Sequence, residues 1–501
     1  MFRFFLAIRF VLRRTRGSSY PATVSSGLTG RIERLLIWSF GEFQRHRRRP
    51  STPVAVDSGS VIIGARLSLG NGPLLENKLV SLSRDDRRRH VYVLGATGAG
   101  KTTLLLKLID ADLAAGKTIV LIDLRGDLVD RVLPRMLASR PAKEWAGRFC
   151  LIDLRQDEHI VGINPLAGVQ DPAYRALHVL SVLRRESSSW GVQLDETARN
   201  SLLALSAVGG SLLDVEPLLC DRAFRTQVLA QVTDVQVKRF FQRYDELSPE
   251  RLAGWFLPVL NKISPIIAIE PFRLMLGSKR SIDFVELLDR PGQVVLIALA
   301  VHRFHNTARL IGSLLVSAIQ LAAVSRADRP EADRNSVTLV LDEFEGMATE
   351  DFLTVVAECR RFGLSLTLAH QNCSQLDVKL RHALRNIVCS QFFFQTGAID
   401  ANQLANEIAV DLPKEDLRSL LMSQAIGEAV LVRRGQAPVR VGVDYSSDPV
   451  VTDAELNELK QIAYRDFGQP SAAVARSIAM GQAPVSEQPR EIRHDRKPKL
   501  S

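Results

Sequence analysis

The sequence predicts an α/β fold: a doubly wound, mostly parallel sheet with an inserted all-α domain and a small β-hairpin near the C-terminus. Short apolar runs rich in β-branched residues alternate with longer segments of helical periodicity, and this alternation is typical of parallel sheets. Residues 171–289 nearly lack such runs and show helical periodicity instead. A glycine-rich loop at residues 95–102 separates a strand from a helix. Together these observations predict an α/β core that binds phosphate groups at the end of a strand.

The glycine-rich loop is the most specific motif in the chain. It matches G-x-x-x-x-G-K-[ST], the phosphate loop of P-loop ATPases, as Gly95-Ala96-Thr97-Gly98-Ala99-Gly100-Lys101-Thr102. The glycines let backbone N–H groups turn inward around phosphates, and the following helix adds the positive end of its dipole. We therefore expect residues Gly95 to Thr103 to bind ATP. Lys101 would contact the β- and γ-phosphates as a catalytic residue, and the Thr102 hydroxyl would ligate Mg²⁺.

The remaining elements follow from periodicity and turn residues. Core strands are expected at 61–64, 78–80, 90–94, 118–121, 149–152, 294–299, 336–341, 364–369 and 387–395, with hairpin strands at 429–433 and 438–444. Helices are expected in the insertion at 176–185, 196–206, 212–219, 223–232, 235–244 and 251–262. Core helices are expected after residue 102 and at 306–325, 349–362, 376–384 and 453–467.

These elements group into five parts. Residues 1–60 form an Arg-rich arm and linker, 61–170 and 290–468 the two parts of the ATPase core, 171–289 the helical insertion, and 469–501 a disordered tail rich in Pro, Gln and mixed charges. Asp123 and Asp153 follow two core strands. Asp123 either looks toward the nucleotide or caps the next helix, and the sequence leaves both alternatives open.

A second motif stands at the end of the expected strand 336–341. Val337-Thr338-Leu339-Val340-Leu341 is an apolar run that ends in Asp342 and Glu343, the form of a Walker B motif. Mg²⁺ requires oxygen ligands, so Asp342 would hold the ion through water. Glu343 would orient and polarise the attacking water.

Two further residues are candidates because of their places beside this motif. The strand at 364–369 runs into Gln371, which would sense the γ-phosphate if that strand lies next to the Walker B strand. Arg360 ends the helix after Walker B. An arginine presented across a subunit interface can neutralise charge on the transferring phosphoryl group, but cations are also common at helix C-termini for local reasons.

The positive charge of the chain is concentrated at its start. The formal net charge is +10, and residues 1–50 hold eleven arginines against Glu33 and Glu42, or +9, which leaves +1 for the rest. Any nucleic-acid surface on the core must therefore be a local patch. The arm is either a solvated segment or a basic surface that lies on an anionic membrane.

Composition also bounds the location of the protein. Five cysteines occur without a C-x-x-C pair, which favours a reducing compartment and argues against a zinc site or a disulfide framework. No segment shows the roughly 20 consecutive apolar residues of a spanning helix, and arginines interrupt the apolar start where a signal peptide would lie. We expect a cytoplasmic protein, with the Arg-rich arm as a means of peripheral attachment to the inner membrane.

The combined motifs resemble the FtsK–HerA branch of RecA-like ATPases, and more narrowly the TraG/TraD-type conjugation coupling proteins and soluble HerA-like translocases. The resemblance covers roughly residues 60–445. It rests on the segments R-H-V-Y-V-L-G into the phosphate loop, I-D-L-R-G-D-L at 122–128, I-N-P-L at 163–166, L-D-E-F at 341–344, E-C-R-R-F-G at 358–363 and A-H-Q-N-C-S-Q-L at 369–376. The last segment and its spacing from Walker B are the most specific.

This resemblance implies a RecA-like core and a homo-oligomeric ring, most often a hexamer, with ATP sites between subunits and DNA in the central channel. It implies Arg360 as a trans-acting arginine and Gln371 as the sensor. It also implies a relaxase, a secretion channel or a nuclease as partner. Coupling proteins usually carry N-terminal membrane helices, and the lack of one here favours a soluble motor or one held by its arm.

The function expected is ATP-driven DNA translocation, with ATP and Mg²⁺ as cofactors. The alternative is a P-loop ATPase that powers protein secretion or assembly without DNA, since the core is nearly neutral. A nucleotide-gated scaffold without hydrolysis is disfavoured by the intact Lys101, Asp342 and Glu343. The sequence leaves open the DNA form, the direction of movement, the pore loops and the biological system.

Overall fold

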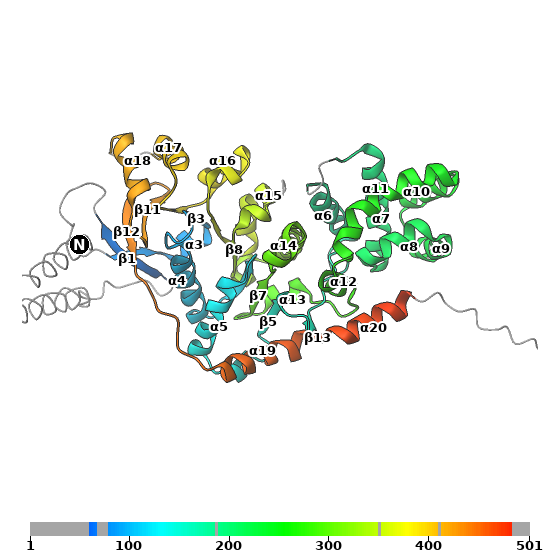
Figure 1. The fold of residues 1–501 in the computed structure, drawn as a ribbon, viewed down its shortest axis with the longest axis horizontal. Helices are drawn as coiled ribbons and strands as arrows, with labels where there is room; N and C mark the ends of the chain where they lie inside the picture. The colour runs from blue at the N-terminus through cyan, green and yellow to red at the C-terminus, as the bar shows by residue number, and fades with distance from the viewer. Residues whose placement is uncertain (1–59, 68–78, 186–188, 349–351, 409–411, 483–501) are drawn as a thin grey trace, which may run out of the picture. The chain divides into compact units, whose positions relative to one another are not determined.

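The structure is a computed structural model that describes residues 60–67, 79–185, 189–348, 352–408 and 412–482 (Figure 1). The Arg-rich arm and the linker up to residue 59 lie outside these residues. The strands are β1 Val61–Leu67, β2 Leu79–Leu82, β3 Val91–Leu94, β4 Thr118–Asp123, β5 Phe149–Asp153, β6 His159–Ile160, β7 Val294–Ala298, β8 Val337–Asp342, β9 Leu364–His370, β10 Ser390–Phe394, β11 Glu428–Arg433, β12 Val439–Val443 and β13 Gln469–Pro470.

Helices fill most of the chain between the strands. The helices of the core are α3 Arg84–Arg88, α4 Lys101–Ala114, α5 Asp127–Ser139, α14 Val301–Val324, α15 Phe352–Glu358, α16 Val378–Ile387, α17 Ala398–Glu407, α18 Lys414–Ser423, α19 Asp453–Phe467 and α20 Ser471–Gln482. The helices between β6 and β7 are α6 Pro172–Arg185, α7 Val192–Val208, α8 Val215–Cys220, α9 Arg222–Gln231, α10 Val235–Asp245, α11 Pro249–Ile267, α12 Glu270–Gly277 and α13 Phe284–Asp289. This stretch is helical as expected for residues 171–289.

The core is one 11-stranded sheet in the order β2-β1-β12-β11-β10-β3-β9-β8-β4-β7-β5. The strands from β10 to β5 in this order pair in parallel. The strands β11, β12, β1 and β2 extend one side of the sheet in antiparallel fashion. The mostly parallel sheet is confirmed, and the hairpin β11–β12 is part of this sheet.

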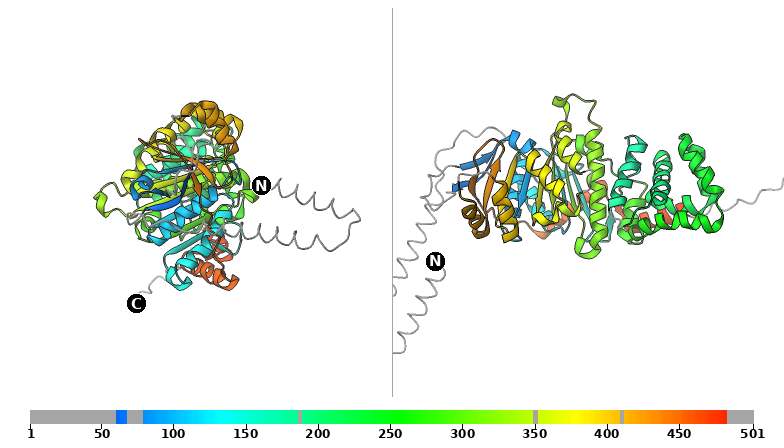
Figure 2. Two further views of the ribbon diagram at one scale, coloured as in Figure 1. Left: turned by 90° about the vertical axis from the view of Figure 1, so that its left-hand side faces the viewer. Right: turned by 90° about the horizontal axis from the view of Figure 1, so that it is seen from above.

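Helices cover both faces of the sheet, as the doubly wound prediction requires (Figure 2). Strand β3 shows why: Val91 and Val93 pack with the apolar residues of α4, α5 and α19, whereas Tyr92 and Leu94 belong to the cluster on the opposite face with α14, α15 and α16. Successive side chains of a strand point to opposite faces. A strand that is apolar at every position must therefore be buried on both sides.

Some element boundaries differ from the sequence expectation. The strand expected at 387–395 begins only at Ser390, because the preceding helix α16 continues to Ile387. The helix expected at 349–362 is α15 followed by a 3-10 turn at Cys359–Phe362, and residues 349–351 are not described. The helix expected at 306–325 begins earlier, at Val301, with non-helical backbone angles at His305.

The expectation of a disordered tail from Gln469 is wrong for its first part. Gln469 and Pro470 pair with β6, and α20 continues to Gln482. Val474 of α20 is buried in the main apolar cluster, and Ile478 lies beside α12. These contacts with the helices of the inserted segment stabilise a stretch whose composition alone favours disorder.

One described helix, α14, has the length and hydropathy of a membrane span, and the bent pair α11–α12 passes the same test if its two parts are taken as one. Of the most apolar window of α14, 72% is buried inside the fold. Helix α14 is therefore placed as a core helix of an α/β fold, whose apolar surface is covered by its own chain.

The phosphate loop is seated against the chain that enters β11. Gly100 has φ 116°, and a Cβ atom there would lie 2.8 Å from the Cα of Gly427. The N–H of Gly427 donates to the carbonyl of Ala99 over 2.9 Å, so this contact is backbone against backbone. Gly98 also has a positive φ, 77°, but a Cβ there would meet nothing within 4 Å.

These two glycines make a matched pair for mutation. We expect Gly98→Ala to lower the free energy of unfolding by about 1–2 kcal/mol through backbone strain alone. Gly100→Ala should cost about 2–5 kcal/mol, because backbone crowding adds to the strain. Denaturant unfolding of the nucleotide-free protein checks this, and equal losses for the two variants would contradict the seating of the loop on Gly427.

Candidate nucleotide-binding site

The candidate site is set by the register of three neighbouring strands. In the pairing of β3 with β9, Leu94 lies beside His370, and in the pairing of β9 with β8, Ala369 lies beside Asp342. The strands are parallel, so the residues that follow them all leave the same edge of the sheet. The phosphate loop, Gln371 and Glu343 are therefore brought together, as the sequence predicts.

The phosphate loop is joined to both neighbouring strands by its backbone. The N–H of Gly95 donates to the carbonyl of His370 over 3.4 Å, and the N–H of Ala96 donates to that of Gln395 over 2.8 Å. The Lys101 ammonium donates back to the carbonyls of Gly95 and Ala96, over 2.7 and 3.1 Å. Lys101 opens α4, so the helix N-terminus points into the loop.

Burial is the main cause that lowers the pKa of Lys101, and the nearby carboxylates of Asp342 and Glu343 oppose it by favouring the charged amine. The pKa of Asp342 is raised to about 7, first by burial and then by the carboxylates of Asp123 and Glu343. Asp123 lies directly beside Asp342 in the pairing of β4 with β8. A carboxylate held in this way favours a cation as partner.

Glu343 lies between two donors at the tip of β8. Its Oε1 accepts from Nε2 of Gln371 over 2.9 Å and from the Arg125 guanidinium over 2.9 Å. Oε1 of Gln371 in turn accepts from the Thr97 hydroxyl of the phosphate loop over 3.0 Å. Glu343 has φ 52°, in the left-handed region that a glutamate rarely adopts. Such strain concentrates at functional sites.

His370 lies in the strand directly before Gln371 and connects two strands of the candidate site. Its side chain is fully buried, and its Nε2 lies 2.5 Å from the hydroxyl of Tyr92 on β3. Burial lowers the pKa of His370 to about 3, so the ring is neutral at physiological pH. The pair ties β9 to β3 directly beneath the residues that carry Gln371 and the phosphate loop.

The donor set fits a magnesium nucleotide. Thr102 and Asp342 supply the hard oxygen ligands that Mg²⁺ prefers, and Mg²⁺ in phosphate sites is commonly held by one or two carboxylates and the phosphates themselves. The described residues contain no cluster of three or more His, Cys, Asp or Glu side chains that could hold a metal alone. With their two oxygen donors, Thr102 and Asp342 suit an ion that arrives with its phosphates.

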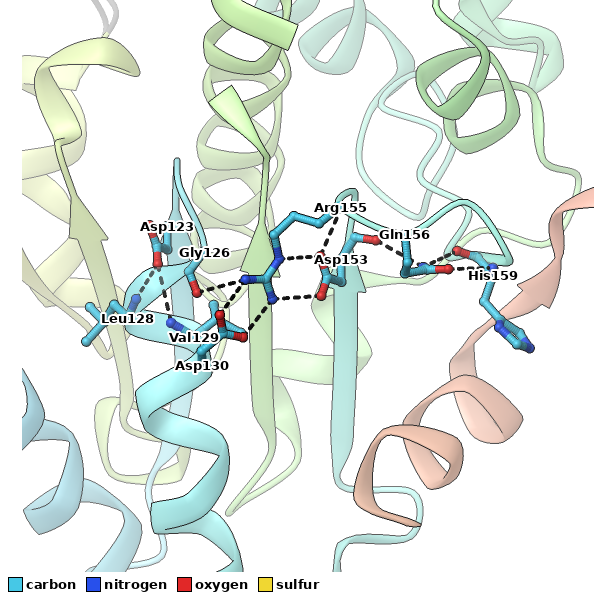
Figure 3. Close-up of polar contacts among 9 residues, drawn as sticks. All are labelled: Asp123, Gly126, Leu128, Val129, Asp130, Asp153, Arg155, Gln156 and His159. Carbon is cyan, nitrogen blue, oxygen red and sulfur yellow. Dashed lines mark hydrogen bonds and ion pairs between the residues drawn. The ribbon is translucent and has the colours of Figure 1, made fainter. Parts of the chain in front are cut away.

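The structure decides the alternatives for Asp123 in favour of the capping role. Its carboxylate accepts from the N–H groups of Leu128 and Val129 in the first turn of α5 (Figure 3), and from the N–H of Arg125 just before that helix. Asp123 acts on the site only through space, by raising the pKa of Asp342. It is a cap with an electrostatic effect on its neighbour.

Asp153 likewise serves local structure. Its carboxylate binds the Arg155 guanidinium through both oxygens at 2.8 Å, and Arg155 also pairs with Asp130 on α5 at 2.6 and 2.8 Å (Figure 3). The hydrogen bonds to Asp153 are the main cause that raises the pKa of Arg155. These contacts tie the loop after β5 to the first turns of α5.

Arg360 lies at the other edge of the sheet. It belongs to the turn that leads into β9, and its guanidinium is 3.7 Å from the carboxylate of Asp85 on α3, which leads into β3. The strands begin at this edge and end at the phosphate loop. The structure thus places Arg360 apart from the site of its own chain, and its action on a neighbouring subunit stays a prediction.

Sequence reasoning did not assign roles to Arg125, Tyr92 or Gly427. Arg125 stands in the I-D-L-R-G-D-L segment, so a motif marked its region but not its contact with Glu343. Tyr92 reads as one more apolar strand position, and Gly427 lies more than 300 residues from the loop it supports. Contacts between distant segments leave no signal in a single sequence.

Known proteins support this description of the fold. The family model described as the type IV secretion-system coupling protein DNA-binding domain matches residues 75–135, which include the phosphate loop and β4. No curated protein matches the sequence. Among solved structures, the unbound conjugative coupling protein TrwBΔN70 is similar with a TM-score of 0.55, at 16% identity, over 82% of this chain and 93% of that one.

Two further structures are similar in the same way. TrwB in complex with ADP and Mg²⁺ gives a TM-score of 0.54 at 16% identity, over 80% of this chain and 97% of that one. VirB4 of Thermoanaerobacter pseudethanolicus gives 0.55 at 12% identity, over 79% and 97%. The matched segment and the shared fold confirm the resemblance drawn from the motifs: residues 75–135 match a domain of the type IV secretion-system coupling proteins, and the chain has a fold similar to that of TrwB and VirB4.

Proposed function

We propose that this protein is a ring-forming motor of the coupling-protein type that hydrolyses ATP between subunits and moves DNA. The observation that carries the proposal is the row of Lys101, Gln371, Glu343 and Asp342 at one edge of three parallel strands. It is supported by the match of residues 75–135 to a family domain described as DNA-binding. The family resemblance also implies a ring of six subunits, and we propose the Arg-rich arm as its means of peripheral attachment to the inner membrane.

Each residue of the row has a task that its position suits. Lys101, at the first turn of α4, neutralises phosphate charge, and Thr102 and Asp342 hold the Mg²⁺ of the nucleotide. The ion supplies positive charge to the phosphate oxygens. Glu343 orients the attacking water, and Gln371 joins this carboxylate to Thr97 of the phosphate loop. A change at the γ-phosphate can thus reach Glu343 through two hydrogen bonds.

An ATPase assay with and without single- and double-stranded DNA tests the function. We expect DNA to stimulate hydrolysis several-fold, and high salt to weaken the effect, because phosphate contacts release counterions.

Lys101→Ala should abolish nucleotide binding, whereas Glu343→Gln should retain binding and stop turnover. Hydrolysis that ignores every DNA form but responds to a secretion or pilus protein would establish the alternative, a protein-moving ATPase, which the nearly neutral core also suits.

Magnesium binding should depend on pH through Asp342. The pKa of its carboxyl is about 7 in the folded protein, so a proton and the cation compete for it below that value. We expect the affinity for Mg²⁺ with ADP to fall about tenfold per pH unit below pH 7 and to level off above pH 8. Titration calorimetry between pH 5.5 and 8.5, with Asp342→Asn as control, checks this. A wild-type profile as flat as that of the control would contradict the assignment.

Arg360 can be tested by mixing two inactive variants. If Arg360 acts in trans, an Arg360→Ala subunit keeps a usable Lys101, and a Lys101→Ala subunit keeps a usable Arg360. Mixed assemblies should therefore recover part of the hydrolysis that each variant lacks alone. Arg361→Ala, one residue away, serves as the control and should stay active. Full activity of Arg360→Ala on its own, or no recovery in confirmed mixed rings, would remove Arg360 from the mechanism.

A further inference from the structure

A basic cleft lies beside the hydrolytic site at the same edge of the sheet. It has a volume of about 480 Å³ and is lined by Arg125, Asp127, Arg155, Val301, His302, His305 and Arg309. These residues follow β4, β7 and β5, which lie in that order on one side of the Walker B strand β8. The long helices α5 and α14 both begin here, so two helix N-termini face the same cleft.

The arginines of the cleft differ in how strongly other side chains already bind them. Arg155 is bound to Asp130 and Asp153, through the contacts drawn in Figure 3, and serves as part of the wall. Among the polar contacts of the described residues, the Arg309 guanidinium makes only a 3.1 Å hydrogen bond to the neutral side chain of Asn306. Arg125 is more than half exposed, at 55%. The cleft thus offers two guanidinium groups to an anion, with two imidazoles beside them.

Both guanidinium groups also contact the acidic loop after β8. Arg125 forms the 2.9 Å ion pair with Oε1 of Glu343. Arg309 packs against Gly346, where an added Cβ atom would lie 3.2 Å from the Nε of Arg309. Burial raises the pKa of Glu345 to about 7, and the positive charge of Arg309 opposes this shift. The cleft and the hydrolytic carboxylate therefore share Arg125, and an anion in the cleft competes with Glu343 for it.

We propose that this cleft binds a phosphate of a nucleic-acid backbone through Arg125 and Arg309, and that Arg125 thereby controls Glu343. This inference rests on the proposed function. Without DNA, Arg125 neutralises Glu343 and holds its Oε1 away from water. When a backbone phosphate takes Arg125, Glu343 is left with Gln371 on the phosphate-loop side and can polarise the attacking water. Arg125 is thus a positioning residue that links DNA binding to hydrolysis.

The experiment combines DNA binding with ATPase rates for full-length wild type, Arg125→Ala and Arg309→Ala. Fluorescence anisotropy with labelled single- and double-stranded oligonucleotides, over a series of salt concentrations, should show weaker binding for both variants. The slope of log affinity against log salt should fall by about 1 for each lost phosphate contact. Arg125→Ala should also hydrolyse ATP several-fold faster than wild type without DNA and respond no further to it.

Arg303→Ala is the matched control. Arg303 stands on the first turn of α14, beside the cleft residue His302, but is paired with Asp157 through two 2.9 Å hydrogen bonds and does not line the cleft. It should bind DNA and hydrolyse ATP as wild type does. Inorganic phosphate at millimolar concentration should not replace DNA as an activator, because the cleft is proposed for a polymer with many phosphates. Activation by inorganic phosphate alone would overturn that part.

Failure of the cleft proposal can be distinguished from failure of the proposed function. If wild type neither binds DNA nor responds to it, the proposed function and this inference both fall. If wild type responds to DNA, and both Arg125→Ala and Arg309→Ala respond as strongly as wild type, only the proposed role of the cleft is refuted. Loss of DNA-free hydrolysis in Arg125→Ala, at unchanged thermal stability, would make Arg125 part of the reaction itself and overturn its controlling role. Arg125→Gln repeats the test should the alanine variant unfold.

Discussion

The parallel pairing of β3, β9 and β8 is the constraint on which the rest of the site depends. Parallel strands release their following residues at one edge of a sheet. The matched ends of these three strands therefore fix the phosphate loop, Gln371 and the Asp342–Glu343 pair side by side. The buried contact between Tyr92 and His370 holds β3 to β9 just below this edge. A shift in register by one residue would move each polar group to the other face of the sheet.

Charge is balanced across this edge. Burial first, and then the like charges of Asp123 and Glu343, raise the pKa of Asp342 to about 7. Lys101 and Arg125 offset part of that repulsion from two sides. Interactions among such groups are stronger than they would be in water. The arrival or departure of one cation or phosphate therefore changes the state of the whole row.

Strained backbone marks the same edge. Glu343 directly follows β8, Ala300 is the second residue after β7, and both have positive φ, at 52° and 53°. His305, at φ 46°, interrupts the first turns of α14. Each such residue costs on the order of 1–3 kcal/mol, which the surrounding structure must offset. Of the four described non-glycine residues with positive φ, only His90, at 70°, lies elsewhere, just before β3 at the opposite edge of the sheet.

Local sequence patterns predict much of this structure. The phosphate loop, the Walker B acids and the order of strands and helices were all legible, because each depends on residues close together in the chain. The helix expected at 453–467 has those bounds, since Thr452 and Glu455 form a capping box at its start. Boundaries failed where local signals were absent: α16 runs on to Ile387, and α20 forms on partners that come from α12 and β6.

The sequence by itself determined the fold class and predicted which residues form the row, because motif spacing and apolar periodicity are properties of short segments. Only the tertiary structure decided that Asp123 is a cap, that Arg125 pairs with Glu343, that Gly427 supports the phosphate loop and that Arg360 lies at the far edge of the sheet. These are contacts between residues far apart in the chain. Strand order and register create them, and no local pattern specifies either.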